Sequence, residues 1–242
     1  MANLLIEIGN TAVKAAWAEE SVLGKTIRYQ GEKVMDFISS ITEKQNPVVM
    51  AVVSVQNIST EDEARLKESC QNLILMDPLH RNMLSDYGIP EYLSYDRGVS
   101  LVAVQHMFKG QSCSVFDLGT TLTVDFIEAD GSYAGGNISV GCRTRFKALN
   151  RYSKALPLID TPEIFGFPGD SVKSSIESGI ISGIMFEIEG YISSKPENTV
   201  IFTGGDAIYF AKRMKNSIFA VCNLGLMGLA IITDEYVKKN IQ

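Results

Sequence analysis

The sequence contains one short pattern twice, first as Leu5-Ile6-Glu7-Ile8-Gly9-Asn10-Thr11 and again as Val115-Phe116-Asp117-Leu118-Gly119-Thr120-Thr121. Each copy has an apolar run, an acid, an apolar residue, a glycine and two small polar residues, and a second apolar run follows. The apolar, β-branched runs predict strands and each glycine predicts a turn. We therefore expect two β-hairpins with an acid and a hydroxyl at the tip. Two unrelated hairpins that agree by chance are the alternative. If the copies are true repeats, they predict two similar subdomains that face each other across a cleft.

The remaining segments alternate between strand and helix, as expected of an α/β protein. Short β-branched runs predict buried strands, and longer patterns with capping residues predict helices. The predicted strands are 47–55, 73–76 and 199–203, and the predicted helices are 60–72 with Thr60 as N-cap, 98–108, 171–193 and a last one that ends near 237. The apolar run 218–232 is too short to span a membrane and is interpreted as part of this last helix. With no low-complexity linker, we expect subdomains 1–111 and 112–242.

Composition excludes some partners and compartments. The 242 residues carry a net charge of -6, which argues against nucleic acid as the main partner because duplex binding depends on Lys and Arg. A nucleotide is not excluded, since backbone N–H groups and a metal ion can hold its phosphates. The four cysteines form no C-x-x-C pair and predict reduced thiols. No basic region precedes an apolar stretch at the N-terminus, so we expect a cytoplasmic protein without a signal peptide.

The first hairpin has groups that suit a triphosphate. Gly9 lets the backbone approach a ligand closely, and Asn10 and Thr11 offer hydrogen-bond donors to phosphate oxygens. Lys14 would neutralise a β- or γ-phosphate, and Glu7 would hold Mg²⁺ through water. An ordinary hairpin with a solvated acid fits the same residues equally well.

The second hairpin would bind the same nucleotide from the other side. Asp117 would ligate a cation, and Thr120 and Thr121 would donate to phosphates. Two glycine-rich stretches are further candidates for contact with a ligand, namely Gly204-Gly205-Asp206 after a buried strand and the segment 135–144. A plain strand–turn–helix link is the alternative interpretation of the first stretch, and a loose loop is the alternative for the second.

The pair Asp96-Arg97 precedes a predicted helix. Asp96 is either an N-cap or the base that accepts the proton of an attacking hydroxyl. Arg97 has the planar fork that binds a carboxylate. Spacing alone does not choose between these interpretations.

Together these motifs resemble those of type III pantothenate kinases, in family order and over nearly the whole chain. The matching segments are Glu7–Lys14 (D-x-G-N-T-x-x-K), Tyr87–Arg97 (Y-x-x-P-x-x-L-G-x-D-R), Asp117–Asp125 (D-x-G-T-A-T-T-x-D), Gly135–Thr144 (G-G-x-I-x-P-G-x-R-T), Ile176–Gly179 (I-Q-S-G) and Thr203–Asp206 (T-G-G-D).

The resemblance implies a duplicated actin-like (ribonuclease H-like) fold, with a mixed sheet flanked by helices in each subdomain and the active site in the cleft. It implies a homodimer that transfers the γ-phosphate of ATP, bound with Mg²⁺, to the 4′-hydroxyl of pantothenate, the first step toward coenzyme A. Asp96 is the implied general base, and Asp117 the implied ligand of a monovalent cation, potassium or ammonium. The implied ATP-binding residues are Glu7, Ile8, Gly9, Asn10, Thr11, Ala12, Val13, Lys14, Thr120, Gly204 and Gly205, and the implied pantothenate-binding residues are Tyr87, Ser94, Tyr95, Asp96, Arg97 and Val172.

Four positions depart from the usual family pattern. Glu7 replaces an aspartate and extends the carboxylate by one methylene. Ser94 replaces a glycine and Val140 a proline, while Val172 falls where a substrate-binding threonine is expected. A valine side chain donates no hydrogen bond, so the backbone or Ser171 would have to supply it. The departures keep two other hypotheses open: a related phosphotransferase that acts on a different hydroxylated metabolite, and a nucleotide-binding regulatory protein.

Overall fold

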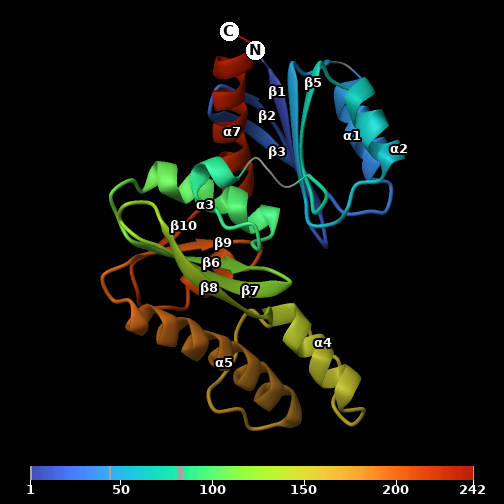
Figure 1. Cartoon of the computed structure of the whole chain (residues 1–242). Coiled ribbons are helices and arrows are strands. Elements are labelled where there is room, and N and C mark those ends of the chain that lie inside the picture. The colour runs from blue at the N-terminus through green and yellow to red at the C-terminus, as the bar shows by residue number, and fades with distance from the viewer. Residues whose placement is uncertain (1, 44, 81–83, 242) are drawn as a thin grey trace. The chain divides into compact units, whose positions relative to one another are not determined.

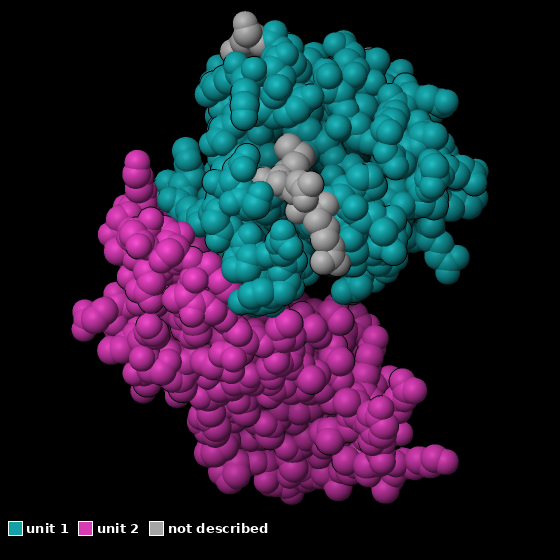
Figure 2. All heavy atoms as spheres, viewed as in Figure 1, with its two compact units in different colours: residues 1–107, 223–242 teal, residues 108–222 magenta. Residues whose placement is uncertain are grey.

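The computed structural model describes residues 2–43, 45–80 and 84–241. The chain divides into two compact units, residues 1–107 with 223–242 (unit 1) and residues 108–222 (unit 2) (Figure 2). The predicted subdomains 1–111 and 112–242 differ from these units mainly at the C-terminus. The last helix belongs to unit 1, because it packs against the first sheet and against a helix that precedes the second hairpin.

Unit 1 contains a five-stranded mixed sheet with the strand order β3-β2-β1-β4-β5. β1 pairs antiparallel with β2 and parallel with β4. Helices α1 and α2 cover one face of the sheet, and α7 covers the other (Figure 1). The elements are β1 (Asn3–Ile8), β2 (Val13–Glu19), β3 (Val22–Tyr29), α1 (Val34–Thr42), β4 (Val49–Ser54), α2 (Thr60–Glu68), β5 (Asn72–Met76), the short 3-10 helix η1 (Ser85–Tyr87), α3 (Tyr95–Met107) and α7 (Leu224–Asn240).

Unit 2 repeats this arrangement with the strand order β10-β9-β6-β7-β8. β6 pairs antiparallel with β7 and parallel with β9, as β1 does with β2 and β4. Its elements are β6 (Cys113–Leu118), β7 (Thr121–Ile127), β8 (Tyr133–Val140), α4 (Cys142–Tyr152), α5 (Val172–Ser194), β9 (Thr199–Thr203), α6 (Ala207–Ala211) and β10 (Ile218–Ala220). The two units therefore share one topology, and the predicted duplicated α/β fold is confirmed.

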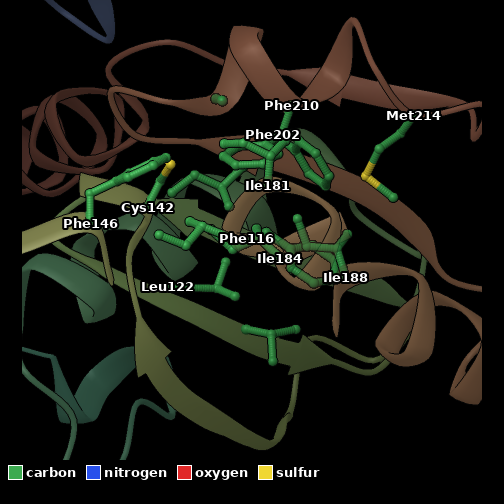
Figure 3. Close-up of a cluster of buried hydrophobic side chains, with 14 of the residues drawn as sticks. Phe116, Leu122, Cys142, Phe146, Ile181, Ile184, Ile188, Phe202, Phe210 and Met214 are labelled. Carbon is green, nitrogen blue, oxygen red and sulfur yellow. The ribbon is translucent and has the colours of Figure 1, made fainter. Parts of the chain in front are cut away.

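The core of unit 2 shows why the second sequence repeat folds as it does. Alternate residues of β6 and β7 point to one face, where Phe116 and Leu122 meet α5 residues such as Ile181 and Ile184 (Figure 3). Phe116 and Phe202 of the neighbouring strand pack edge to face, with ring centroids 5.3 Å apart. Such burial removes apolar surface from water and supplies most of the folding free energy.

Unit 1 buries an equivalent set on the face covered by α1 and α2, including Leu4, Ile6 and Ile8 of β1. On the opposite face α7 crosses α3 at very short range. A Cβ at Gly228 of α7 would lie 1.7 Å from the main-chain oxygen of Val99. Glycine is required there because any side chain would collide with the backbone of α3.

Three predicted elements differ in detail from the structure. The segment 218–220, predicted as helix, forms the edge strand β10, which pairs with β9. The N-cap of α2 is Ser59, whose hydroxyl accepts from the Asp62 N–H, and not Thr60. Helix α3 begins at Tyr95, three residues before its predicted start.

No helix among the described residues is long and apolar enough to span a bilayer.

The α3–α7 crossing predicts that Gly228→Ala destabilises the protein by about 1–3 kcal/mol, because the added methyl group forces the helices apart. The matched control is Gly190→Ala in α5, where an added Cβ meets nothing within 4 Å. We expect the control to gain about 0.4–1 kcal/mol, since alanine narrows the unfolded ensemble. Urea unfolding measures both variants, and equal midpoints for the two would contradict the close crossing.

Candidate functional site

The first hairpin joins β1 to β2 through a tight turn of four residues. The N–H of Gly9 donates to the carbonyl of Ala12 at 3.0 Å, which closes the turn. Asn10 and Thr11 at its tip are exposed. The predicted hairpin is confirmed, and the tip offers polar groups to solvent.

Glu7 and Lys14 face each other across this hairpin. They are register partners in the β1–β2 ladder, and the Lys14 Nζ donates to Glu7 Oε1 at 3.0 Å. Lys14, predicted to neutralise a phosphate, thus forms an ion pair with the acid of the same motif. The other oxygen, Glu7 Oε2, is buried and has no hydrogen-bond partner among the described residues.

Asp96 and Arg97 lie in the first turn of α3. Asp96 is half-buried, and its Oδ1 accepts from the Arg97 N–H at 2.9 Å. The hydroxyl of Ser100, one turn on, donates to the main-chain oxygen of Asp96. Because Asp96 stands inside the helix, it is not the N-cap that one interpretation of the sequence predicted.

Tyr87 belongs to η1 and is tied to the last helix. Its hydroxyl donates to Glu235 Oε2 at 2.5 Å. Burial of the phenol and the neighbouring Glu235 carboxylate raise the pKa of Tyr87. The phenol is therefore neutral at physiological pH. Of the other residues predicted to bind the substrate in unit 1, Tyr95 is buried and Ser94 is exposed.

The second hairpin gathers backbone groups around Asp117 in unit 2. A Cβ at Gly204 would lie 2.3 Å from Asp117 Oδ1 and 2.5 Å from the main-chain oxygen of Leu118. Gly204 also has φ +91, in the left-handed region that favours glycine. The Asp206 N–H donates to the same Leu118 oxygen at 2.9 Å. The T-G-G-D segment is thus packed against the end of β6.

Thr120 lies at the exposed tip of the second hairpin, and its main chain is hydrogen-bonded to the start of α4. Its main-chain oxygen accepts from the Gly141 N–H and from the Thr144 hydroxyl at 2.8 Å. The segment 135–144, for which a loose loop was one alternative, is in fact strand β8 followed by α4. Asp206 occupies the N-cap position of α6 without a capping hydrogen bond, and burial raises its pKa although Arg143 opposes the shift.

Val172 opens helix α5, and its side chain is 59% exposed. Ser171, which could have replaced the missing threonine, is the N-cap of this helix and forms a capping box with Ser174. Its hydroxyl is used within the chain, so Val172 leaves an apolar surface at this position.

Sequence analysis missed Asp77, a buried carboxylate in the loop after β5. Its Oδ2 accepts from the Ile58 N–H at 2.8 Å, and its Oδ1 lies 2.7 Å from the His80 ring. It joins the loops that follow β4 and β5, at the carboxyl ends of parallel strands where open α/β sheets bind ligands. Burial favours the neutral acid, but the Ile58 N–H and His80 outweigh it and lower the pKa of Asp77. The Asp-Pro step after an apolar strand is the only sequence signal for this role.

The repeated sheet with an acid-bearing hairpin is the duplicated actin-like fold. Among solved structures, the chain is similar to a conserved protein of the Baf family of transcriptional activators from Campylobacter jejuni, with TM-score 0.65, 20% identity and coverage of 97% of this chain and 99% of that one. It is also similar to the activator of 2-hydroxyisocaproyl-CoA dehydratase from Clostridium difficile with bound ADPNP, with TM-score 0.59, 11% identity and coverage of 99% and 96%. At these identities the likeness concerns the fold alone.

The family itself is shown by sequence. The family model described as type III pantothenate kinase matches residues 3–194. The type III pantothenate kinase of Phocaeicola vulgatus is 34% identical over 233 residues, which cover 94% of this chain and 96% of the relative. The chain belongs to the type III pantothenate kinase family.

The contacts of Asp77 with the Ile58 N–H and the His80 ring predict that the folded protein loses stability in acid. Because the pKa of Asp77 is lowered in the folded protein, its stabilisation is present above the unfolded value of about 3.9 and is lost as pH falls below it. Asp77→Asn should reduce stability by about 1–3 kcal/mol at pH 7, since buried N–H donors lose their charged partner. Urea midpoints at pH 7 and pH 3 measure the difference, which should shrink at pH 3. A gap of the same size at both pH values would contradict the assignment.

Proposed function

We propose that this protein is an ATP-dependent kinase that phosphorylates the 4′-hydroxyl of pantothenate, the first step of coenzyme A biosynthesis. The observation that carries the proposal is the family match over residues 3–194. That range includes both acid-bearing hairpins, the Asp96-Arg97 pair and Val172. Of the residues assigned to the proposed site, only Gly204 and Gly205 lie beyond the matched range.

ATP would bind to the turn residues of both hairpins. The segment 7–14 supplies exposed donors at Asn10 and Thr11 and a lysine next to Glu7. Thr120 is exposed at the second tip, Gly204 packs against Asp117, and a Cβ at Gly205 would meet nothing within 4 Å. Backbone N–H groups at glycine turns bind phosphate oxygens without net positive charge, which suits an acidic chain.

Pantothenate would bind near the start of α3. Asp96 accepts the proton of the 4′-hydroxyl as its oxygen attacks the γ-phosphorus, and ADP leaves with the bond electrons. Arg97 pairs with the pantothenate carboxylate, since its planar fork matches two oxygens. Ser94 and Tyr95 directly precede the pair. Tyr87 would have to share its hydroxyl with Glu235, to which it now donates.

Cations would supply the positive charge that the sequence lacks near the phosphates. The residues fit them in two places: Glu7 Oε2 is a buried carboxylate oxygen with no hydrogen-bond partner among the described residues, and Asp117 Oδ1 and the Leu118 carbonyl oxygen, two possible oxygen ligands, both lie against Gly204. Oxygen ligands suit hard cations, so Glu7 would face Mg²⁺ and Asp117 potassium or ammonium. The described residues contain no group of three His, Cys, Asp or Glu side chains arranged for a metal, so ATP oxygens and water would complete either site.

The proposal includes a homodimer that works in the cytoplasm. Unit 2 exposes large apolar side chains, among them Phe167, Phe186 and Val172, each at least 59% exposed. Phe167 and Phe186 pack edge to face with centroids 6.3 Å apart. Exposed apolar groups of this size support a subunit contact. The four cysteines are free, which supports a reducing compartment.

A coupled assay for ADP release tests the activity. With saturating ATP, Mg²⁺ and potassium, pantothenate should stimulate ADP release, and Asp96→Asn should lower the rate by about 10²-fold or more because the base is lost. Binding of a fluorescent ATP analogue to Asp96→Asn should stay normal, which shows that the variant is folded.

Three results would count against the proposal or against one of its assigned roles. No stimulation by pantothenate, with stimulation by another hydroxylated metabolite, would make the protein a different kinase. Nucleotide binding without any phosphoryl transfer would favour a regulatory protein. A near-normal rate in Asp96→Asn would remove Asp96 from the role of base.

The role of Asp117 predicts a change in salt dependence. In the wild type, potassium should stimulate the reaction relative to an equal concentration of sodium. Asp117→Asn should lose this stimulation and bind ATP about tenfold more weakly, since the carboxylate no longer balances the cation. Initial rates against potassium concentration measure the effect. The same potassium curve in both proteins would contradict the assignment.

A further inference from the structure

The carboxylate of Glu7 lies on the face of the first sheet that is covered by α7. Residues alternate between faces along a strand. Leu4, Ile6 and Ile8 point into the core on the α1 and α2 side, so Glu7 points to the other face of the sheet. Helix α7 covers that face (Figure 1). The acid that begins the phosphate motif is thus packed against the last helix of the chain.

Gly225 in the first turn of α7 borders this carboxylate. A Cβ at Gly225 would lie 2.8 Å from Glu7 Oε2, 3.3 Å from Glu7 Cδ and 3.6 Å from the Ser100 hydroxyl. The closest atom is the carboxylate oxygen that is buried and has no hydrogen-bond partner among the described residues. The missing side chain of Gly225 therefore provides the space that the end of Glu7 occupies.

Backbone conformation does not require a glycine at this position. Gly225 is absent from the residues with positive φ, and glycine in a helix is less favourable than alanine. Gly228 is explained by the backbone of Val99, but the three atoms nearest to a Cβ at Gly225 all belong to the side chains of Glu7 and Ser100. Space for the carboxylate is the remaining physical reason for a glycine here.

We propose that Gly225 is a positioning residue for Glu7, and that glutamate at position 7 and glycine at position 225 depend on each other. A glutamate is longer than an aspartate by one C–C bond, about 1.5 Å. The space at Gly225 takes up this length, so the carboxylate keeps its pairing with Lys14. The inference rests on the proposed function in that Glu7 and Lys14 belong to the ATP site.

A side chain at position 225 would disturb two groups at once. It would push the Glu7 carboxylate away from α7 and strain the 3.0 Å bond from Lys14. It would also crowd Ser100, whose hydroxyl donates to the main-chain oxygen of Asp96. A shorter acid at position 7 withdraws the carboxylate from the added methyl group and relieves the first disturbance.

Four proteins test the dependence: the wild type, Gly225→Ala, Glu7→Asp and the double variant. Titration calorimetry with a non-hydrolysable ATP analogue and Mg²⁺ gives affinity, steady-state assays give KM for ATP and kcat, and thermal unfolding gives Tm. We expect Gly225→Ala to weaken analogue binding about tenfold and to lower Tm, because contacting residues couple. Adding Glu7→Asp should restore most of both losses. Gly190→Ala, which meets nothing within 4 Å, should bind the analogue normally and keep or raise Tm.

The outcomes separate this inference from the proposed function. Gly225→Ala with unchanged affinity and unchanged or higher Tm overturns it, as does a double variant no better than Gly225→Ala. If Gly225→Ala does not fold, a folded double variant supports the pair and an unfolded one overturns it. A wild type without pantothenate-dependent ADP release would contradict the proposed function, while the Tm comparison would still decide the pairing of Glu7 with Gly225.

Discussion

An acid near the carboxyl end of the central strand is the constraint around which each unit is arranged. β1 and β6 each have an antiparallel partner on one side and a parallel partner on the other. At the carboxyl end of each central strand, the hairpin turn lies on the side of the antiparallel partner. The loop that follows the parallel partner lies on the other side. Glu7 and Asp117 stand one residue before the end of these strands, so backbone from two directions meets each carboxylate.

Close approach of backbone to a carboxylate needs glycine, and each unit provides it from a distant segment. Gly204 follows β9 and approaches Asp117, while Gly225 lies in the first turn of α7 and approaches Glu7. A carboxylate kept from water must find hydrogen bonds or a cation. Glu7 has one oxygen on Lys14 and the other without a hydrogen-bond partner among the described residues, which is the electrostatic basis for a cation in the proposed ATP site.

The departures from the usual family pattern have different physical consequences. Glu7 is accommodated, because its extra length is packed against α7. Val172 is not compensated by its neighbour, because Ser171 is committed to capping α5. Ser94 is exposed just before the Asp96 turn, where a side chain has room. The proposed ATP site thus keeps its chemistry in a modified form, whereas the surface at Val172 becomes more apolar.

The sequence by itself determined the two hairpins, the α/β class and the duplication, because these depend on neighbours within a few residues. The turn at Gly9 and the alternation of buried residues along β1 are local properties. The turn sets the register of the hairpin, and this register makes Glu7 and Lys14 partners. Tertiary structure decided that the last helix joins unit 1, that 218–220 forms an edge strand, and that Asp77 links two loops. It also decided which face of the sheet α7 covers, and hence that Gly225 meets Glu7. Hydrophobic periodicity predicts that a residue is buried, but it does not predict which residues it contacts. Contacts between segments so far apart in the chain form only when the helices pack.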